Sequence, residues 1–245
     1  MSAALKIICL DLLILSLSVL EISAYRLNGI YSLVAAKVWF VWFLLFLITA
    51  IYYVVTTLID DFRKRHFSGI IALLIVTLLV TFKLESFPID ISGEATTQVA
   101  AGLSNWKNTD FGYTGTAFLD NPNKQFLLVS IPSLLLGRSI INYRLGYILP
   151  FLLGVFLFYS GLRIFYDRKR KSPVFIAFGI LSLIAFPIIP LLLRTFEQIT
   201  NPLSFTLLSI GMFLITEKRN RFLNYLALAW IITMLANIYV PALAV

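Results

Sequence analysis

Seven long apolar runs, each close to the length needed to cross a lipid bilayer, constrain this chain more than any other feature. They lie at roughly 5–24, 37–59, 67–83, 145–166, 173–193, 203–216 and 222–243. A membrane-crossing helix needs about 20 predominantly apolar residues, and only helices and closed barrels satisfy their backbone hydrogen bonds within a membrane. The sequence therefore predicts an all-α fold, a polytopic bundle of about seven transmembrane helices.

Composition supports an integral membrane protein. Hydrophobic residues make up 60% of the 245 residues and charged residues 13%, whereas soluble domains average about 45–50% apolar and about 25% charged residues.

The single cysteine, Cys9, excludes an intramolecular disulfide and a cysteine-based metal cluster. The single histidine, His66, lies in a basic stretch, and we interpret it as an interfacial loop residue because a metal site needs several ligands at defined spacing. We expect no metal and no cofactor.

The basic residues predict the orientation of the bundle. The formal net charge is +8, and the basic residues cluster at 63–65, 163–171 and 218–221, between apolar runs. With seven alternating helices these clusters fall on one side, which the positive-inside rule makes cytoplasmic. We therefore expect a multi-pass protein of the plasma membrane with a cytoplasmic N-terminus. Because the clusters are separated along the chain, they do not indicate a nucleic-acid partner.

A polar segment divides the chain into three regions: three spans at 1–83, the segment at 84–144 on the outer face, and four further spans at 145–245. Residues 94–106 have the spacing of a short amphipathic helix, and 108–112 and 121–123 have turn composition. Residues 125–132 predict a second surface helix, which 137–139 should end. The helices should turn Val99, Leu103, Phe126 and Leu127 towards apolar surroundings.

An ordered series of short motifs runs through and beyond this segment. Gly93-Glu94-Ala95 opens the first surface helix, 120–125 forms a turn, 144–154 enters the next span, and 161–165 leaves it. This series resembles the N-terminal half of the C-type membrane glycosyltransferases, which include protein O-mannosyltransferases and aminoarabinose transferases. The resemblance covers about residues 84–245. Members of that family are considerably longer, so we expect this chain to be a fragment or a reduced relative.

The resemblance implies transfer of a sugar from a polyprenyl-phosphate donor to a lipid, glycan or protein acceptor on the outer face. A carboxylate would act as general base and deprotonate the acceptor hydroxyl. The family's motif aspartate falls on Gly93, which leaves Glu94 and Asp90 as the candidate catalytic residues. The alternative is that both are solvated turn acids near the start of a helix, where a carboxylate is favourable in any case.

The remaining candidate residues would bind substrate. Cationic and amide groups would stabilise the departing lipid phosphate, although basic residues at span ends also extend to lipid headgroups without any ligand. An arginine and a glutamate three residues apart can simply pair with each other. Trp106 either stacks on sugar or anchors the interface. The candidates are Lys124, Asp120, Asn121, Arg138, Arg144, Arg194, Glu197 and Trp106.

Two other functions remain open at this point. The chain could be a catalytically silent membrane subunit or scaffold of the same fold, which Gly93 and the short length both favour. It could instead be a transporter or channel. The apolar runs lack the repeatedly broken helices and central charges of a substrate pathway, which argues against transport.

Overall fold

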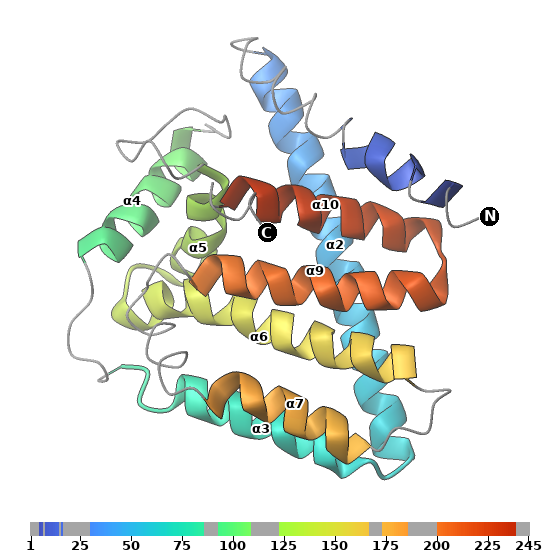
Figure 1. Cartoon of the computed structure of the whole chain (residues 1–245). Coiled ribbons are helices and arrows are strands. Elements are labelled where there is room, and N and C mark those ends of the chain that lie inside the picture. Colours follow the sequence, from blue (N-terminus) through green and yellow to red (C-terminus); the bar gives the residue numbers. More distant parts are fainter. Residues whose placement is uncertain are drawn as a thin grey trace.

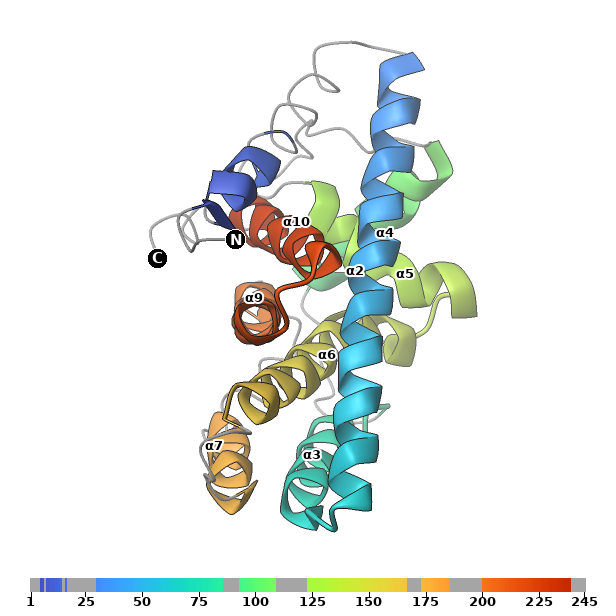
Figure 2. The same cartoon turned by 90° about the vertical axis from the view of Figure 1, so that its right-hand side faces the viewer.

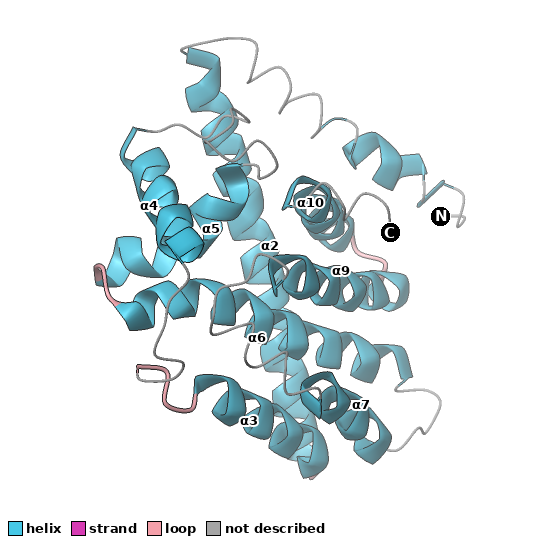
Figure 3. Ribbon diagram, turned by 60° about the vertical axis from the view of Figure 1, so that its left-hand side comes forward, coloured by secondary structure: helices cyan, strands magenta, loops and turns pink. Residues whose placement is uncertain are grey.

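The computed structural model describes residues 5–16 apart from 7 and 15, and residues 30–85, 93–108, 123–166, 173–185 and 200–238. These residues form helices and no strands (Figure 3). The prediction of an all-α fold is confirmed for them. The helices are α2 (Ile30–Arg63), α3 (Phe67–Thr81), α4 (Gly93–Asn108), α5 (Asn123–Leu136), α6 (Ile140–Tyr166), α7 (Pro173–Ala185), α9 (Thr200–Arg219) and α10 (Phe222–Ile238).

Helix α6 is shared by two apolar clusters and so forms the centre of the packing. One cluster joins it to α2, α9 and α10, and there Phe46 of α2 stacks on Trp230 of α10 with ring centroids 5.0 Å apart. The other cluster joins α6 to α3 and α7, through fully buried side chains such as Val76 and Ile180. The remaining helices are therefore arranged around α6.

Glycines allow α6 and α9 to pack with their backbones close together. A Cβ atom added to Gly161 would lie 2.6 Å from the backbone oxygen of Gly211. One added to Gly154 would lie 2.8 Å from the backbone oxygen of Ser204. Small residues at such positions are typical of tightly packed helix pairs in membrane proteins.

Helix α2 crosses the other helices obliquely and stands upright in Figure 2, where α9 is seen nearly end-on. A tight turn ends it. Arg65 adopts a left-handed φ of 58°, the amide of His66 donates to the Asp61 carbonyl over 2.8 Å, and the amide of Arg65 donates to the Phe62 carbonyl over 3.2 Å. These two bonds define a Schellman motif. The turn directs α3 back along the bundle and holds His66 beside the end of α2.

The helix connections gather at two ends of the bundle (Figure 1). One end, the basic end, contains the end of α2, the end of α6 and the turn from α9 to α10. The opposite end, the α4–α5 end, contains these two helices and the start of α6. Of the three basic clusters of the sequence, residues 63–65, Arg163 and residues 218–221 lie at the basic end, whereas 167–171 lie outside the described residues.

Two helical stretches, Phe40–Arg63 and Ile140–Tyr166, are long and apolar enough to cross a membrane by length and composition. They suggest membrane association. The helices at three other predicted spans are shorter, since α3 has 15 residues, α7 has 13 and α10 has 17. At 1.5 Å per residue a 15-residue helix is about 22 Å long, less than the roughly 30 Å hydrocarbon core of a bilayer.

In the described part of the polar segment the two expected helices are present, whereas the predicted turns at 108–112 and 121–123 lie almost entirely outside the described residues. Helices α4 and α5 lie where the two surface helices were expected, and residues 137–139 form the turn that separates α5 from α6. Gly137 adopts a left-handed φ of 87° in this turn. The Ser139 hydroxyl accepts a hydrogen bond from the backbone amide of Asn142 over 3.1 Å and so caps the start of α6. This cap begins α6 at Ile140 rather than near residue 145, so that Arg144 lies within the helix.

Candidate functional site

Helices α4 and α5 pack against the start of α6 and form the part of the structure in which the sequence predicted an active site. Val99 of α4, Val129 of α5 and Tyr147 of α6 are buried together, and Leu103 packs against them. Leu127 is fully buried as well. The expected apolar environment is thus confirmed for Val99, Leu103 and Leu127, whereas the Phe126 side chain lies outside the described residues.

Trp106 joins three helices. Its Nε1–H donates to the carbonyl oxygen of Leu127 over 3.0 Å and so links α4 to α5. Its ring meets Phe40 of α2 edge-on, with centroids 6.4 Å apart and ring planes at 87°. Through this hydrogen bond and this aromatic contact, the half-buried indole of Trp106 holds α4 in position against α5 and α2.

Polar side chains lie in the interior beneath α4. Arg144 is completely buried and donates through Nη1 to the carbonyl oxygen of Leu84, just beyond α3. Tyr147 donates its hydroxyl proton to Oε1 of Gln98, which is also buried. Buried polar groups require such partners. Arg144 therefore holds the end of α3 to α6, in the protein interior and not at a lipid-facing surface.

The structure describes only some of the predicted site residues at this end. Glu94 is the second residue of α4 and Lys124 the second of α5, but their side chains lie outside the description. Arg138 is exposed in the turn between α5 and α6. Asp90, Asp120, Asn121, Arg194 and Glu197 lie outside the described residues.

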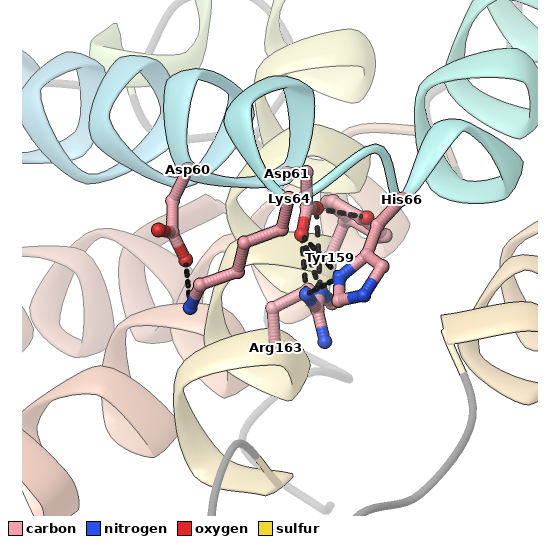
Figure 4. Close-up of polar contacts among 6 residues, drawn as sticks. All are labelled: Asp60, Asp61, Lys64, His66, Tyr159 and Arg163. Atoms are coloured by element: carbon pink, nitrogen blue, oxygen red, sulfur yellow. Dashed lines mark hydrogen bonds and ion pairs between the residues drawn. The ribbon is translucent and has the colours of Figure 1, made fainter.

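A second polar cluster lies at the basic end, formed by Asp61, His66, Tyr159 and Arg163 (Figure 4). Arg163 of α6 donates from Nε to Oδ1 and Oδ2 of Asp61 over 2.9 and 3.2 Å, and its Nη2 forms an ion pair with Oδ1. Tyr159 donates its hydroxyl proton to Oδ2 of Asp61. The Nδ1 of His66 lies 3.0 Å from Nη2 of Arg163.

Local sequence sets the position of each of these groups within its own helix or turn. Tyr159 and Arg163 are four residues apart, so they lie on the same face of α6. Asp61 is in the last turn of α2, and the turn after it places His66 alongside. Gly69 of α3 leaves room for the phenol, because a Cβ atom there would lie 1.8 Å from the Tyr159 hydroxyl. Three helices thus meet around one carboxylate.

The chemistry available to Asp61 follows from its partners. Its side chain is 1% exposed and both oxygens accept hydrogen bonds from Arg163 or Tyr159. Because all of these donors belong to α6, the cluster fastens α2 to α6. In the part of the chain that the structure describes, no group of three or more His, Cys, Asp or Glu side chains could hold a metal ion.

Sequence reasoning did not single out Asp61 or Tyr159, and it interpreted Arg163 as an orientation signal and as part of the 161–165 motif. One signal was available. Asp61 is an acidic residue at the end of an apolar run, and charges at such positions usually find a partner on another helix. The identity of that partner was not available, because Arg163 is 102 residues away in sequence.

Compared with known proteins, the chain matches no family model, and neither a curated protein nor a solved structure is significantly similar to it.

Proposed function

We propose that this chain is a C-type membrane glycosyltransferase, or the N-terminal part of one, with a bundle of about seven spans and a cytoplasmic N-terminus. It would transfer a sugar from a polyprenyl-phosphate donor to an acceptor at the outer face of the membrane. The observation that carries this proposal is the arrangement of α4 and α5. Two short helices follow α3, pack on each other and join the long apolar helix α6, in the order that the resemblance implies.

The position of Glu94 supports its assignment as the base. It lies in the first turn of α4, at the place where the resemblance puts the family's acidic motif. In the proposed reaction Glu94 takes the proton of the acceptor hydroxyl, whose oxygen attacks the anomeric carbon. The bond from that carbon to the phosphate oxygen breaks, and polyprenyl phosphate leaves with the bonding electron pair.

Lys124 and Arg138 are the residues proposed to stabilise the phosphate as negative charge develops on it. Arg138 is exposed at the α4–α5 end and is able to contact a ligand there. We assign Arg144 a positioning role, since it is completely buried and bonded to the Leu84 carbonyl. Trp106 is assigned both to positioning and to sugar contact at its exposed part.

Glycosyl transfer by the complete reading frame that contains this chain tests the proposal. Glu94→Gln keeps the size of the side chain and removes the proton acceptor, so turnover should fall by about 10²–10⁴-fold. Asp90→Asn should have a smaller effect. Glu85→Gln is the matched control, because it removes an exposed carboxylate just after α3 and should leave turnover unchanged.

The two carboxylates can be told apart by the result. An inactive Asp90→Asn protein together with an active Glu94→Gln protein would move the base to Asp90. Activity in both variants would contradict the catalytic assignment. No activity in the unmodified protein with any polyprenyl-phosphate sugar would favour the second candidate, a silent subunit of the same fold. Gly93 at the position of the family's aspartate is the observation that favours this second candidate.

Thiol labelling in intact cells tests the proposed topology. In a Cys9→Ser background, Arg138→Cys lies at the α4–α5 end and Arg63→Cys at the basic end, and both positions are exposed. An impermeant maleimide should label the first and not the second. Labelling of only the second would invert the orientation and remove the outer-face assignment of α4 and α5.

A further inference from the structure

The basic end contains a cavity of about 720 Å³ beside the Asp61–Arg163 pair. Helix α2 forms one wall with hydroxyl-bearing side chains such as Tyr52 and Thr56. Helices α6 and α9 and the turn between α9 and α10 form the others. Pockets for small ligands typically measure about 300–1,000 Å³. The cavity is therefore large enough for a polar headgroup, and it lies at the opposite end of the bundle from α4 and α5 (Figure 1).

Positive charge predominates in the lining, which contains five cationic side chains and three carboxylates. Two carboxylates already have cationic partners. Asp61 pairs with Arg163, and Asp60 pairs with Lys64 over 2.7 Å. The lining then contains one further carboxylate, Glu217, and three further cations, Lys218, Arg219 and Arg221.

Arg219 and Arg221 are the cations best placed to bind a ligand. Lys218 already lies over the Phe165 ring, with Nζ 4.7 Å from its centroid. Among the described residues neither Arg219 nor Arg221 forms an ion pair, and both are exposed. Guanidinium groups bind phosphate through two parallel hydrogen bonds. A phosphate group is thus the ligand chemistry that matches the cavity.

The wall that carries Arg221 is fixed in place. Tyr225 of α10 donates its hydroxyl proton to Oδ1 of Asn220 over 2.9 Å, next to Arg221 in the turn. Tyr53 of α2 donates to Oδ1 of Asn224 over 3.1 Å, which ties α10 to α2 across the cavity. A site whose walls are already ordered loses less entropy when a ligand binds.

The source of the phosphate follows from the position of the cavity. Helices α2 and α6 contain the two stretches that are long and apolar enough to cross a membrane, and both end beside the cavity, at Arg63 and Tyr166. Spans end where lipid headgroups begin. We propose that this cavity binds the phosphate-bearing headgroup of an anionic lipid, a site separate from the proposed site of sugar transfer.

Native mass spectrometry of the full chain in detergent, titrated with phosphatidylglycerol, tests this proposal. Each guanidinium that bonds to the phosphate should contribute about tenfold or more to affinity. The double substitution Arg219→Gln with Arg221→Gln should therefore weaken binding about 100-fold. Glu217→Gln removes the remaining carboxylate of the cavity lining and should strengthen binding severalfold.

The matched control removes two other charges from the same end. Arg63 and Arg65 are exposed at the end of α2 and do not line the cavity. Their double substitution by glutamine should change affinity by less than about threefold, a small part of one charge-assisted hydrogen bond. Equal losses in the two double variants would show general attraction to basic residues and overturn the proposal.

Two further titrations identify the lipid and its phosphate. Phosphatidylcholine, which has no net charge, should bind at least tenfold more weakly than phosphatidylglycerol, and equal binding would contradict an anion site. Glycerol 3-phosphate should not displace the lipid at equal concentration, because it lacks the acyl chains. Displacement at equal concentration would refute a lipid as the ligand and assign the site to a soluble phosphate ester.

Discussion

The Asp61–Arg163 pair permits a controlled test of what holds α2 to α6, because the residue before Asp61 is also an aspartate in an ion pair. Asp61→Asn and Asp60→Asn are the same chemical change at adjacent positions. The Asp61 side chain is 1% exposed and the Asp60 side chain is 52% exposed. The comparison therefore isolates the effect of burial from that of the substitution.

The expected loss of folding free energy depends on how deeply the charge that loses its partner is buried. Asp61→Asn removes the counter-charge of Arg163, whose side chain is 9% exposed. An uncompensated charge at a buried position costs about 3–5 kcal/mol of folding free energy. Asp60→Asn breaks a pair with Lys64, which lies four residues further on in the turn that ends α2, and both side chains are about half exposed. Such pairs contribute only about 0.3–0.5 kcal/mol.

Thermal unfolding of the full chain in mild detergent, followed by tryptophan fluorescence, measures both changes. For a chain of this size, 1 kcal/mol corresponds to roughly 2–4 °C in Tm. Asp61→Asn should therefore lower Tm by roughly 6–20 °C and Asp60→Asn by less than about 2 °C. Removing the other charge as well, with Arg163→Met, should recover part of the loss. Equal Tm values for the two single variants would refute the structural role given to the buried pair.

Four further predictions concern backbone and glycine positions, each measured by the same unfolding assay. Gly211→Ala should destabilise by about 1–3 kcal/mol, because its Cβ would lie 2.7 Å from the α6 backbone. Gly179→Ala on α7, where nothing lies within 4 Å, should instead stabilise by up to about 1 kcal/mol, and a loss there would show that helix propensity does not decide that position. Arg65→Gly should stabilise by about 0.5–1 kcal/mol by relieving a left-handed φ, and no gain would question the Schellman turn. Gly69→Ala should displace the hydroxyl of Tyr159 from its carboxylate and cost about 1.5–3 kcal/mol, and full stability would contradict that contact.

Local patterns in the sequence were sufficient to predict much of the α4–α5 end. The amphipathic spacing of residues 94–106 predicted the helix that is observed as α4. The glycine and serine of 137–139 predicted the turn before α6. Both features depend on interactions within a few residues. The burial of Val99 and Leu103 followed from the same periodicity. Helix boundaries were less accurate, because the Ser139 cap starts α6 earlier than its apolar composition indicated.

The role of buried charges could not be predicted locally. Its position at the start of an apolar run suggested that Arg144 lies at the membrane interface, yet Arg144 is buried against the end of α3. Asp61 and Arg163 belong to different helices far apart in sequence. Their pairing depends on the distance between α2 and α6, and on a glycine in a third helix that leaves room for Tyr159. None of these quantities is a property of a single segment.

The sequence by itself determined the helical class and the apolar character of the helices, because both follow from composition and periodicity along the chain. Tertiary structure decided which polar side chains are buried, which of them meet, and where a polar cavity remains. The physical reason is that burial and ion pairing depend on how helices approach one another. In α6 and α9 that approach is set by glycines whose missing side chains allow backbone contact.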